Sequence, residues 1–150
     1  MKIVFDTNIA FSAILNTNGK IGDLLLNSKD VFQFYSHSFI KDELLEHHEK
    51  LKAISKLSNE EIEGVKELIF NKMTFLREEL IPEEIWIEAE RLTLDIDEDD
   101  TDFVALTIFL DADLWTGDKP LYRGLKNKNF NRVLNTDEVW ELRSKQESET

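Results

Sequence analysis

Short strand-type segments alternate with helix-type segments along this chain, and this alternation limits the fold more than any other feature. Residues 3–5 are an apolar run that ends at Asp6, and residues 31–35 are β-branched and aromatic. Residues 114–116 and 131–134 predict two more strands. Strands joined through helices pair in parallel by right-handed crossovers. The expected fold is therefore α/β, a three-layer α/β/α domain with a central parallel sheet of about four or five strands.

Apolar residues at helical spacing mark the connecting segments. Helices are expected over residues 10–15, 21–26, 40–51, 58–73, 82–92, 101–110 and 136–142. Ser58 with Glu61 predicts a capping box, Ser36 or Ser38 is expected to cap the third helix, and Thr136 the last. The helix of 101–110 is apolar on most sides, which indicates a buried position. We expect one domain over residues 1–143 and a flexible tail over 144–150.

The composition excludes several classes of protein. The chain has 150 residues, 41% of them hydrophobic, which is enough to bury the core of one globular domain. It has no cysteine, so disulfides and thiolate metal sites are excluded. Asp6 and Asn8 interrupt the apolar N-terminal run, which argues against a signal peptide, and no apolar stretch is long enough to span a bilayer. A cytoplasmic protein without a membrane partner is expected.

Carboxylates that lie far apart in the sequence are expected to meet at one edge of the sheet. Asp6 ends the first strand, and Asp118 follows the strand of 114–116. Asp100 lies in the first turn of the apolar helix, where free backbone N–H groups favour a carboxylate. Glu43 lies early in the helix after the second strand. In a parallel sheet these positions lie beyond the carboxyl ends of the strands, where ligands bind.

Such a group of acids needs a counter-charge. Carboxylates within a few ångströms repel one another, and they either take up protons or bind a cation. Oxygen ligands favour Mg²⁺ or Mn²⁺ over zinc, and a water on such an ion is a nucleophile suited to phosphodiester hydrolysis. Each acid also has a plainer interpretation: Asp6 caps a helix, Glu43 is solvated, Asp118 belongs to a turn, and residues 97–102 form a solvated acidic loop. Only their combination favours a metal site.

Three segments of the chain resemble those of the PIN-domain ribonucleases, a family that includes the toxins of many bacterial toxin–antitoxin pairs. The segment IVFDTNIAFSAIL looks like the opening strand, acid and small-residue helix of that family. The segment DEDDTDFVALTIFLDADLWTGDKPL resembles its later motif, which is an Asp before an apolar helix, a short strand and Thr-x-Asp. FIKDELLEHHEKL fits the middle acidic position. The similarity covers the chain from Lys2 to about Leu142.

This resemblance implies a divalent-metal-dependent endoribonuclease with Mg²⁺ or Mn²⁺ as cofactor. The positions that match the metal-binding catalytic acids are Asp6, Glu43, Asp100 and Asp118. Asn8 and Thr116 match residues that orient these acids through hydrogen bonds. Asp97 is a candidate outer acid, and Asp99 and Asp102 remain alternatives to Asp100.

The same resemblance implies partners as well as chemistry. It suggests an RNA substrate, a homodimer and an antitoxin protein that binds the chain. The alternative function is a catalytically weak PIN-like module that binds RNA or protein. Metal-dependent RNA cleavage distinguishes the two.

The charge distribution bears on the substrate. A formal net charge of −13 argues against nucleic-acid binding, because phosphate contacts require cations. Residues 119–132 nevertheless contain only basic charged residues, namely Lys119, Arg123, Lys126, Lys128 and Arg132. With Tyr122 and Phe130 between them, these cations are expected to hold an RNA backbone beside the metal. The alternative is that Tyr122, Leu125 and Phe130 pack inward while the cations are solvated.

Overall fold

A parallel five-stranded sheet forms the centre of the computed structural model, which describes residues 1–28 and 30–148. The strands run in the spatial order β3-β2-β1-β4-β5. Their bounds are β1 (Lys2–Phe5), β2 (Gln33–His37), β3 (Met73–Leu76), β4 (Asp113–Trp115) and β5 (Val133–Leu134). Every pairing is parallel, which confirms the expected α/β sheet.

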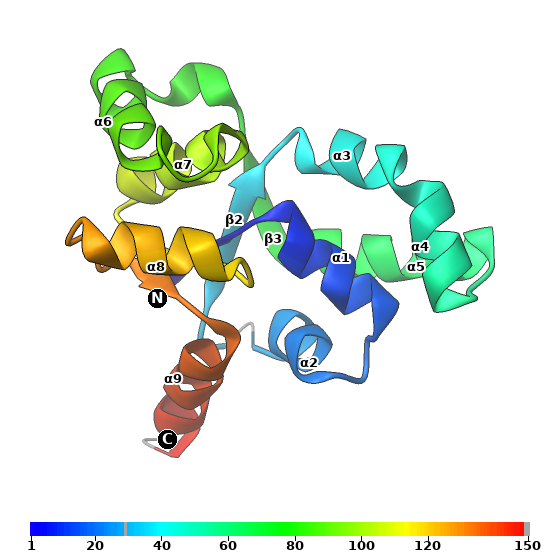
Figure 1. Cartoon of the computed structure of the whole chain (residues 1–150). Coiled ribbons are helices and arrows are strands. Elements are labelled where there is room, and N and C mark those ends of the chain that lie inside the picture. The colour runs from blue at the N-terminus through cyan, green and yellow to red at the C-terminus, as the bar shows by residue number, and fades with distance from the viewer. Residues whose placement is uncertain (29, 149–150) are drawn as a thin grey trace.

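Helices cover both faces of this sheet and complete the three layers (Figure 1). One face carries α1 (Thr7–Leu15), α2 (Lys20–Leu26), α3 (Ile40–Glu46), α4 (His48–Ser55), α5 (Asn59–Phe70) and α9 (Thr136–Ser148). The other carries α6 (Glu83–Thr93), α7 (Thr101–Leu110) and α8 (Lys119–Asn127). Short 3₁₀ turns, η1 (Glu78–Leu80) and η2 (Glu98–Asp100), precede α6 and α7.

The central strand β1 explains why two separate cores form. Ile3, Val4 and Phe5 are all fully buried. Successive side chains of a strand point to opposite faces, so Ile3 and Phe5 pack into one core and Val4 into the other. An apolar run without alternation is therefore the pattern of a strand that is covered on both sides.

Helix α7 occupies the position that its composition predicts. Its residues from Phe103 to Thr107 are buried, and it packs against β1, β2 and β4. A helix that is apolar around its circumference has no face to offer to water, so it must lie between the sheet and another helix. That second helix is α6, and η2 connects the two. The packing brings the acidic residues before Thr101 to the carboxyl edge of the sheet.

Two elements differ from the sequence expectation because their signals are short. Met73 continues the helical spacing of α5 but begins β3, which pairs with β2. The segment of 119–127 is helix α8, in which Leu121 and Leu125 are the buried pair. Two leucines four residues apart, among basic residues, do not make a repeat that is long enough to predict a helix from the sequence.

Several smaller expectations are corrected. Strand β2 begins at Gln33, two residues later than expected, and the third helix is divided at His47 into α3 and α4. No serine caps α3, because Ser36 lies within β2 and donates to the carbonyl of Phe5. The capping box of α5 is confirmed.

At the C-terminus the cap of α9 also differs from the expected one. Asn135, not Thr136, exchanges hydrogen bonds with Glu138 in the first turn of the helix. The helix continues as far as Ser148, while residues 149 and 150 lie outside the described part of the chain. Within the described residues, we find no helix with the length and hydropathy needed to cross a membrane.

Gly22 and Gly64 differ in the space around them, so we expect alanine at these two positions to change the stability of the fold in opposite directions. A Cβ atom at Gly22 would lie 2.5 Å from the backbone oxygen of Thr17, whereas a Cβ at Gly64 meets nothing within 4 Å. We expect Gly22→Ala to lower the free energy of unfolding by about 1–3 kcal/mol through overpacking. We expect Gly64→Ala to raise it by about 0.5–1 kcal/mol, because alanine restricts the unfolded chain. Urea denaturation measures both, and a stabilising Gly22→Ala would contradict the close approach of α2 to the preceding turn.

Candidate metal and nucleic-acid site

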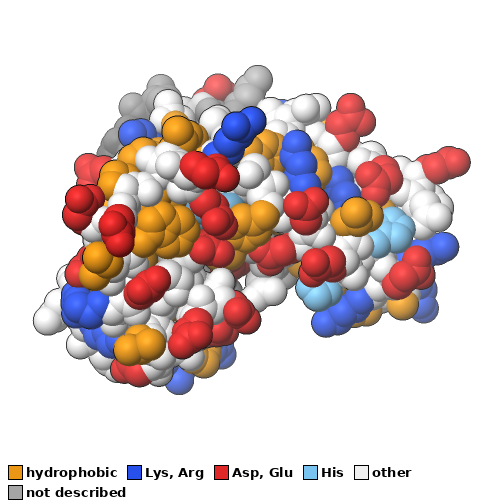
Figure 2. Space-filling model, turned by 90° about the horizontal axis from the view of Figure 1, so that it is seen from above, with side chains coloured by type: hydrophobic (Ala, Val, Ile, Leu, Met, Phe, Trp, Pro, Cys, Tyr) orange, Lys and Arg blue, Asp and Glu red, His pale blue; other side chains and the backbone are white. Residues whose placement is uncertain are grey.

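A cavity of about 190 Å³ lies beyond the carboxyl ends of β1 and β4. It is lined by Asp6, Thr7, Asn8, Glu43, Asp97, Asp99, Asp100, Phe103 and Asp118. All of the acids that the sequence singles out as metal ligands therefore face one cavity. Figure 2 looks down on the molecule from above the view of Figure 1 and shows acidic side chains predominating across this side.

Asp6 is held rigidly at the bottom of this cavity. Strand register pairs Phe5 with Trp115, so the following residues, Asp6 and Thr116, become neighbours at the edge of the sheet. The hydroxyl of Thr116 donates to Asp6 Oδ2 at 2.9 Å, and the backbone N–H of Ile9 donates to Oδ1 at 3.0 Å. Only 2% of Asp6 is exposed, and this burial, together with the charge of Asp118, raises its pKa to about 6.

Thr116 connects Asp6 to Asp118. While its hydroxyl donates to Asp6, the same oxygen accepts the backbone N–H of Asp118 at 3.0 Å. Asp118 Oδ1 in turn accepts the backbone N–H of Leu121 at 3.0 Å and caps α8. One buried threonine thus holds the carboxylate of Asp6 and the backbone of Asp118, which is the geometry that an orienting residue needs.

Asp97, Asp100 and Asp118 form a close group of acids that could hold a metal ion. One oxygen from each lies within 4.8 Å of the others. Asp97 caps η2 by accepting the backbone N–H of Asp99 at 2.9 Å, and residues three apart lie on the same side of such a turn. Asp97 therefore belongs to the group itself, although its sequence position suggested an outer role.

The charges that act most strongly on Asp100 are those of other carboxylates. Burial raises the pKa of Asp100 to about 7, with further contributions from Asp6, Asp97, Asp118 and Asp99. Its Oδ2 atom is buried without a hydrogen-bond partner. Because the available ligands are carboxylate oxygens, the group fits a hard divalent cation such as Mg²⁺ or Mn²⁺.

Glu43 and Asn8 line the cavity in different ways. Glu43 Oε2 accepts the hydroxyl of Thr7 at 2.8 Å, which attaches α3 to the start of α1. Glu43 is not a member of the group formed by Asp97, Asp100 and Asp118. The backbone N–H of Asn8 lowers the pKa of Asp6, whereas the Asn8 side chain is exposed.

Asp102 is not among the residues that line the acidic cavity. It lines a separate cavity with Trp86 and Glu98. Burial, with Glu78 and Glu43 nearby, raises its pKa to about 6. Its backbone carbonyl accepts a hydrogen bond from the ring of His37, a buried residue at the end of β2. The structure thus separates Asp102 from Asp100, two residues that sequence alone does not distinguish.

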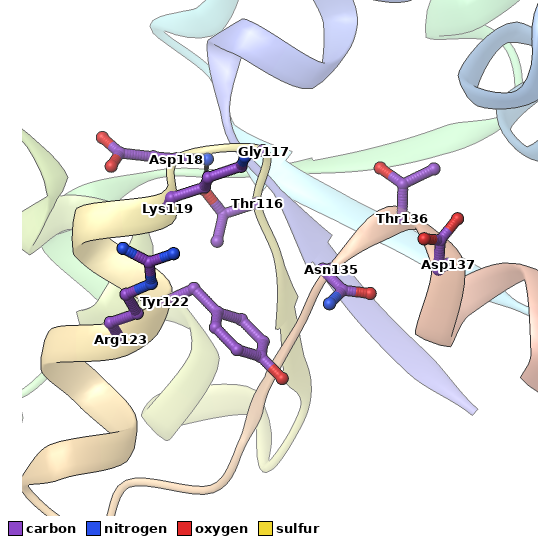
Figure 3. A pocket seen from close by; sticks show the side chains of 9 residues that line it. All are labelled: Thr116, Gly117, Asp118, Lys119, Tyr122, Arg123, Asn135, Thr136 and Asp137. Atoms are coloured by element: carbon purple, nitrogen blue, oxygen red, sulfur yellow. Dashed lines mark hydrogen bonds between the residues drawn. The ribbon is translucent and has the colours of Figure 1, made fainter.

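A second cavity, of about 390 Å³, opens on the other side of Asp118 (Figure 3). Lys119 and Arg123 line it, so two of the five expected RNA-binding cations border the site. The other three have partners: Lys126 lies 5.5 Å from the centre of the Tyr122 ring, Lys128 pairs with Asp95, and Arg132 pairs with Asp111.

The aromatic residues of this segment contribute to packing. Phe130 and Tyr122 are half-buried against the core on the α6–α8 face, and Leu125 is fully buried. The hydroxyl of Tyr122 donates to Glu138 at 2.7 Å. The inward-packing alternative therefore describes Leu125 and Phe130, whereas Tyr122 packs on the core and also lines the second cavity, where two of the cations remain open to a ligand.

Comparison with known proteins identifies the fold. A family model described as "PIN domain" matches residues 4–143. The crystal structure of VapBC2 from Rickettsia felis bound to a DNA fragment from their promoter contains a similar chain. The similarity has a TM-score of 0.58 at 15% identity and covers 90% of this chain and 98% of the other. No curated protein matches this sequence.

The raised pKa of Asp100 predicts a pH-dependent stability. A folded-state pKa of about 7 against an ordinary 3.8 means that the ionised carboxylate destabilises the fold. This penalty is absent below the ordinary pKa, grows as the pH rises and is complete above about pH 7. We expect Asp100→Asn, in EDTA at pH 8, to be more stable than the wild type by about 1–2 kcal/mol after allowance for solvent screening.

Thermal denaturation at two pH values checks this expectation. The advantage of Asp100→Asn shrinks at pH 5, and Mg²⁺ at pH 8 raises the melting temperature of the wild type more than that of the variant. Glu46→Gln, which removes an exposed carboxylate from α3, is the control and shows neither effect. A variant that is less stable than the wild type at pH 8 in EDTA would contradict the uncompensated charge.

Proposed function

Because this chain belongs to the PIN-domain family, we propose that it is a divalent-metal-dependent endoribonuclease that hydrolyses RNA phosphodiester bonds. The observation that carries the proposal is the convergence of Asp97, Asp100 and Asp118 beside the buried Asp6. A fold without a ligand for these acids gains nothing from holding them together, since Asp118 raises the pKa of Asp6, and Asp6, Asp97 and Asp118 raise that of Asp100. Such strained arrangements of charge concentrate at functional sites.

We assign different roles to the residues that line the cavity. Asp97, Asp100 and Asp118 would hold Mg²⁺ or Mn²⁺, and Glu43 and the buried Asp6 line the same cavity. When bound, such an ion activates water as a nucleophile and neutralises the charge of the scissile phosphate.

Two threonines fix the positions of the acids. Thr116 keeps Asp6 and Asp118 in register, and Thr7 keeps Glu43 directed toward the cavity. Both hydroxyls donate to carboxylate oxygens, which limits the rotation of these side chains before a ligand arrives. A cluster prepared in this way needs little rearrangement to bind a cation.

Two further aspects of the function concern partners. The family resemblance, and the similarity of fold to a chain of VapBC2, support an antitoxin protein as the partner and a toxin as the biological role. We also propose a homodimer on the same family ground. Co-purification with the product of a neighbouring gene, and the mass of the isolated protein in solution, test these two points.

Loss of single carboxylates tests the catalytic proposal. We expect the wild type to cleave unstructured RNA in Mn²⁺ or Mg²⁺ and to stop in EDTA. We expect Asp6→Asn and Asp100→Asn to reduce the cleavage rate by about 100-fold or more, because each removes charge that the cation requires. Glu43→Gln is expected to reduce the rate as well, whereas Glu46→Gln, one turn further along the same helix, leaves it unchanged. Gel analysis of labelled RNA measures each rate.

The same assay separates catalysis from simple binding. RNA that is bound by folded wild-type protein but not cleaved in either metal would favour the alternative, a PIN-like module that binds RNA or protein. Cleavage that persists in Asp6→Asn at the wild-type rate would place the chemistry outside this cavity.

A further inference from the structure

The larger cavity beside Asp118 has the size and position of a ligand site. Its volume of about 390 Å³ lies within the range of about 300–1,000 Å³ that small-molecule sites occupy. It lies between the start of α8 and the turn from β5 into α9, and Asp118 is shared with the acidic cavity (Figure 3). A ligand that reaches from one cavity to the other passes Asp118.

Two cations in this cavity lack partners. Throughout residues 1–28 and 30–148, Lys119 and Arg123 make neither an ion pair nor a contact with an aromatic ring. Both are exposed and line the cavity, on the first two turns of α8. In a chain with a net charge of −13, two unpaired cations at one cavity are a local exception that favours an anion.

The neutral groups on the opposite wall offer hydrogen-bond donors. Asn135 Oδ1 accepts the backbone N–H of Glu138 at 2.9 Å, so its amide nitrogen is the end left for a ligand. Thr136 Oγ1 accepts the indole N–H of Trp115 at 3.1 Å, which leaves the hydroxyl proton of Thr136 to donate. A ligand of this cavity is therefore rich in acceptors.

The acids at this wall are already engaged. Asp137 pairs with Lys20 at 2.8 Å. Glu138 Oε1 accepts both the hydroxyl of Tyr122 at 2.7 Å and the backbone N–H of Asn135 at 3.1 Å. These bonds direct the carboxylates toward protein donors and fix the ring of Tyr122 as the apolar part of the wall. Asp137 and Glu138 therefore repel an anionic ligand less than free carboxylates would. Asp118 also lines the cavity, and its Oδ1 atom accepts the backbone N–H of Leu121.

We propose that this cavity binds one nucleotide of single-stranded RNA next to the scissile phosphate. Lys119 and Arg123 hold its phosphate, the ring of Tyr122 contacts its sugar or base, and Asn135 and Thr136 donate to their oxygens. The subsite rests on the proposed ribonuclease function for its role, but its existence follows from the cavity and its donors alone. Cations and an aromatic face are the combination with which proteins hold single strands.

Binding of uridine 5′-monophosphate in EDTA tests the subsite without the metal. We expect the nucleotide to shift the amide NMR signals of Tyr122, Asn135 and Thr136. We expect Lys119→Gln and Arg123→Gln each to weaken binding by about tenfold, because a charge-assisted hydrogen bond is lost. Lys145→Gln, which removes an exposed cation from α9, is the charge-matched control and leaves the affinity unchanged.

Each outcome of the titration decides for or against the subsite. Equal affinities of Arg123→Gln and Lys145→Gln, or signal shifts confined to another surface, would overturn it. Inorganic phosphate that binds as tightly as the nucleotide would also overturn it, because the cavity would then be an anion site only. Uridine alone is expected to bind more weakly than the nucleotide.

A cleavage assay separates this inference from the proposed function. We expect Lys119→Gln and Arg123→Gln to raise KM for a short RNA several-fold with little change in kcat, and to reduce the salt dependence of KM. Wild-type protein that binds the nucleotide but cleaves no RNA would contradict the ribonuclease and leave the subsite standing. Normal cleavage with unchanged KM in both variants would contradict the subsite and leave the ribonuclease standing.

Discussion

The buried hydrogen bond from Thr116 to Asp6 is the contact on which the acidic site depends. It joins the residues that directly follow two neighbouring parallel strands, and it exists because β1 and β4 pair in a register that sets Phe5 opposite Trp115. Two further contacts of the cavity start at these residues. The Thr116 hydroxyl oxygen also accepts the backbone N–H of Asp118, and Thr7, which follows Asp6, donates a hydrogen bond to Glu43. A change in strand register would separate all of these groups.

Helix α7 supplies the opposing half of the site, at an electrostatic cost. Its burial beneath α6 brings Asp97 and Asp100 toward Asp118, and the resulting desolvation and repulsion appear as the raised pKa of Asp100. The hydrophobic packing of α7 offsets this cost, so the fold keeps a group of acids that would otherwise separate. Unfavourable local interactions, here between neighbouring carboxylates, are characteristic of functional sites when the surrounding fold is stable enough to hold them.

The overall acidity of the chain and its proposed RNA substrate are compatible because charge is arranged locally. Of the basic residues in 119–132, Lys128 and Arg132 form ion pairs, whereas Lys119 and Arg123 stay open at the cavity beside Asp118. A net charge describes attraction at long range, which salt screens, but a bound phosphate responds to the groups within a few ångströms. The count of cations in this segment therefore overstates the number that face the site.

The sequence by itself determined the α/β class, the buried strand and the buried helix, because these depend on hydrophobic period. Position at strand ends predicted Asp6 and Asp118, whereas Asp100 and Glu43 were expected from motif spacing and the family resemblance. The sequence did not determine β3 and α8, whose apolar patterns are too short to distinguish from their surroundings. Nor did it decide that Asp97 joins Asp100 and that Asp102 does not, or which cations remain unpaired. Only the tertiary structure decided these points, because they depend on how a single turn directs each side chain and on which partner from a distant segment lies within reach.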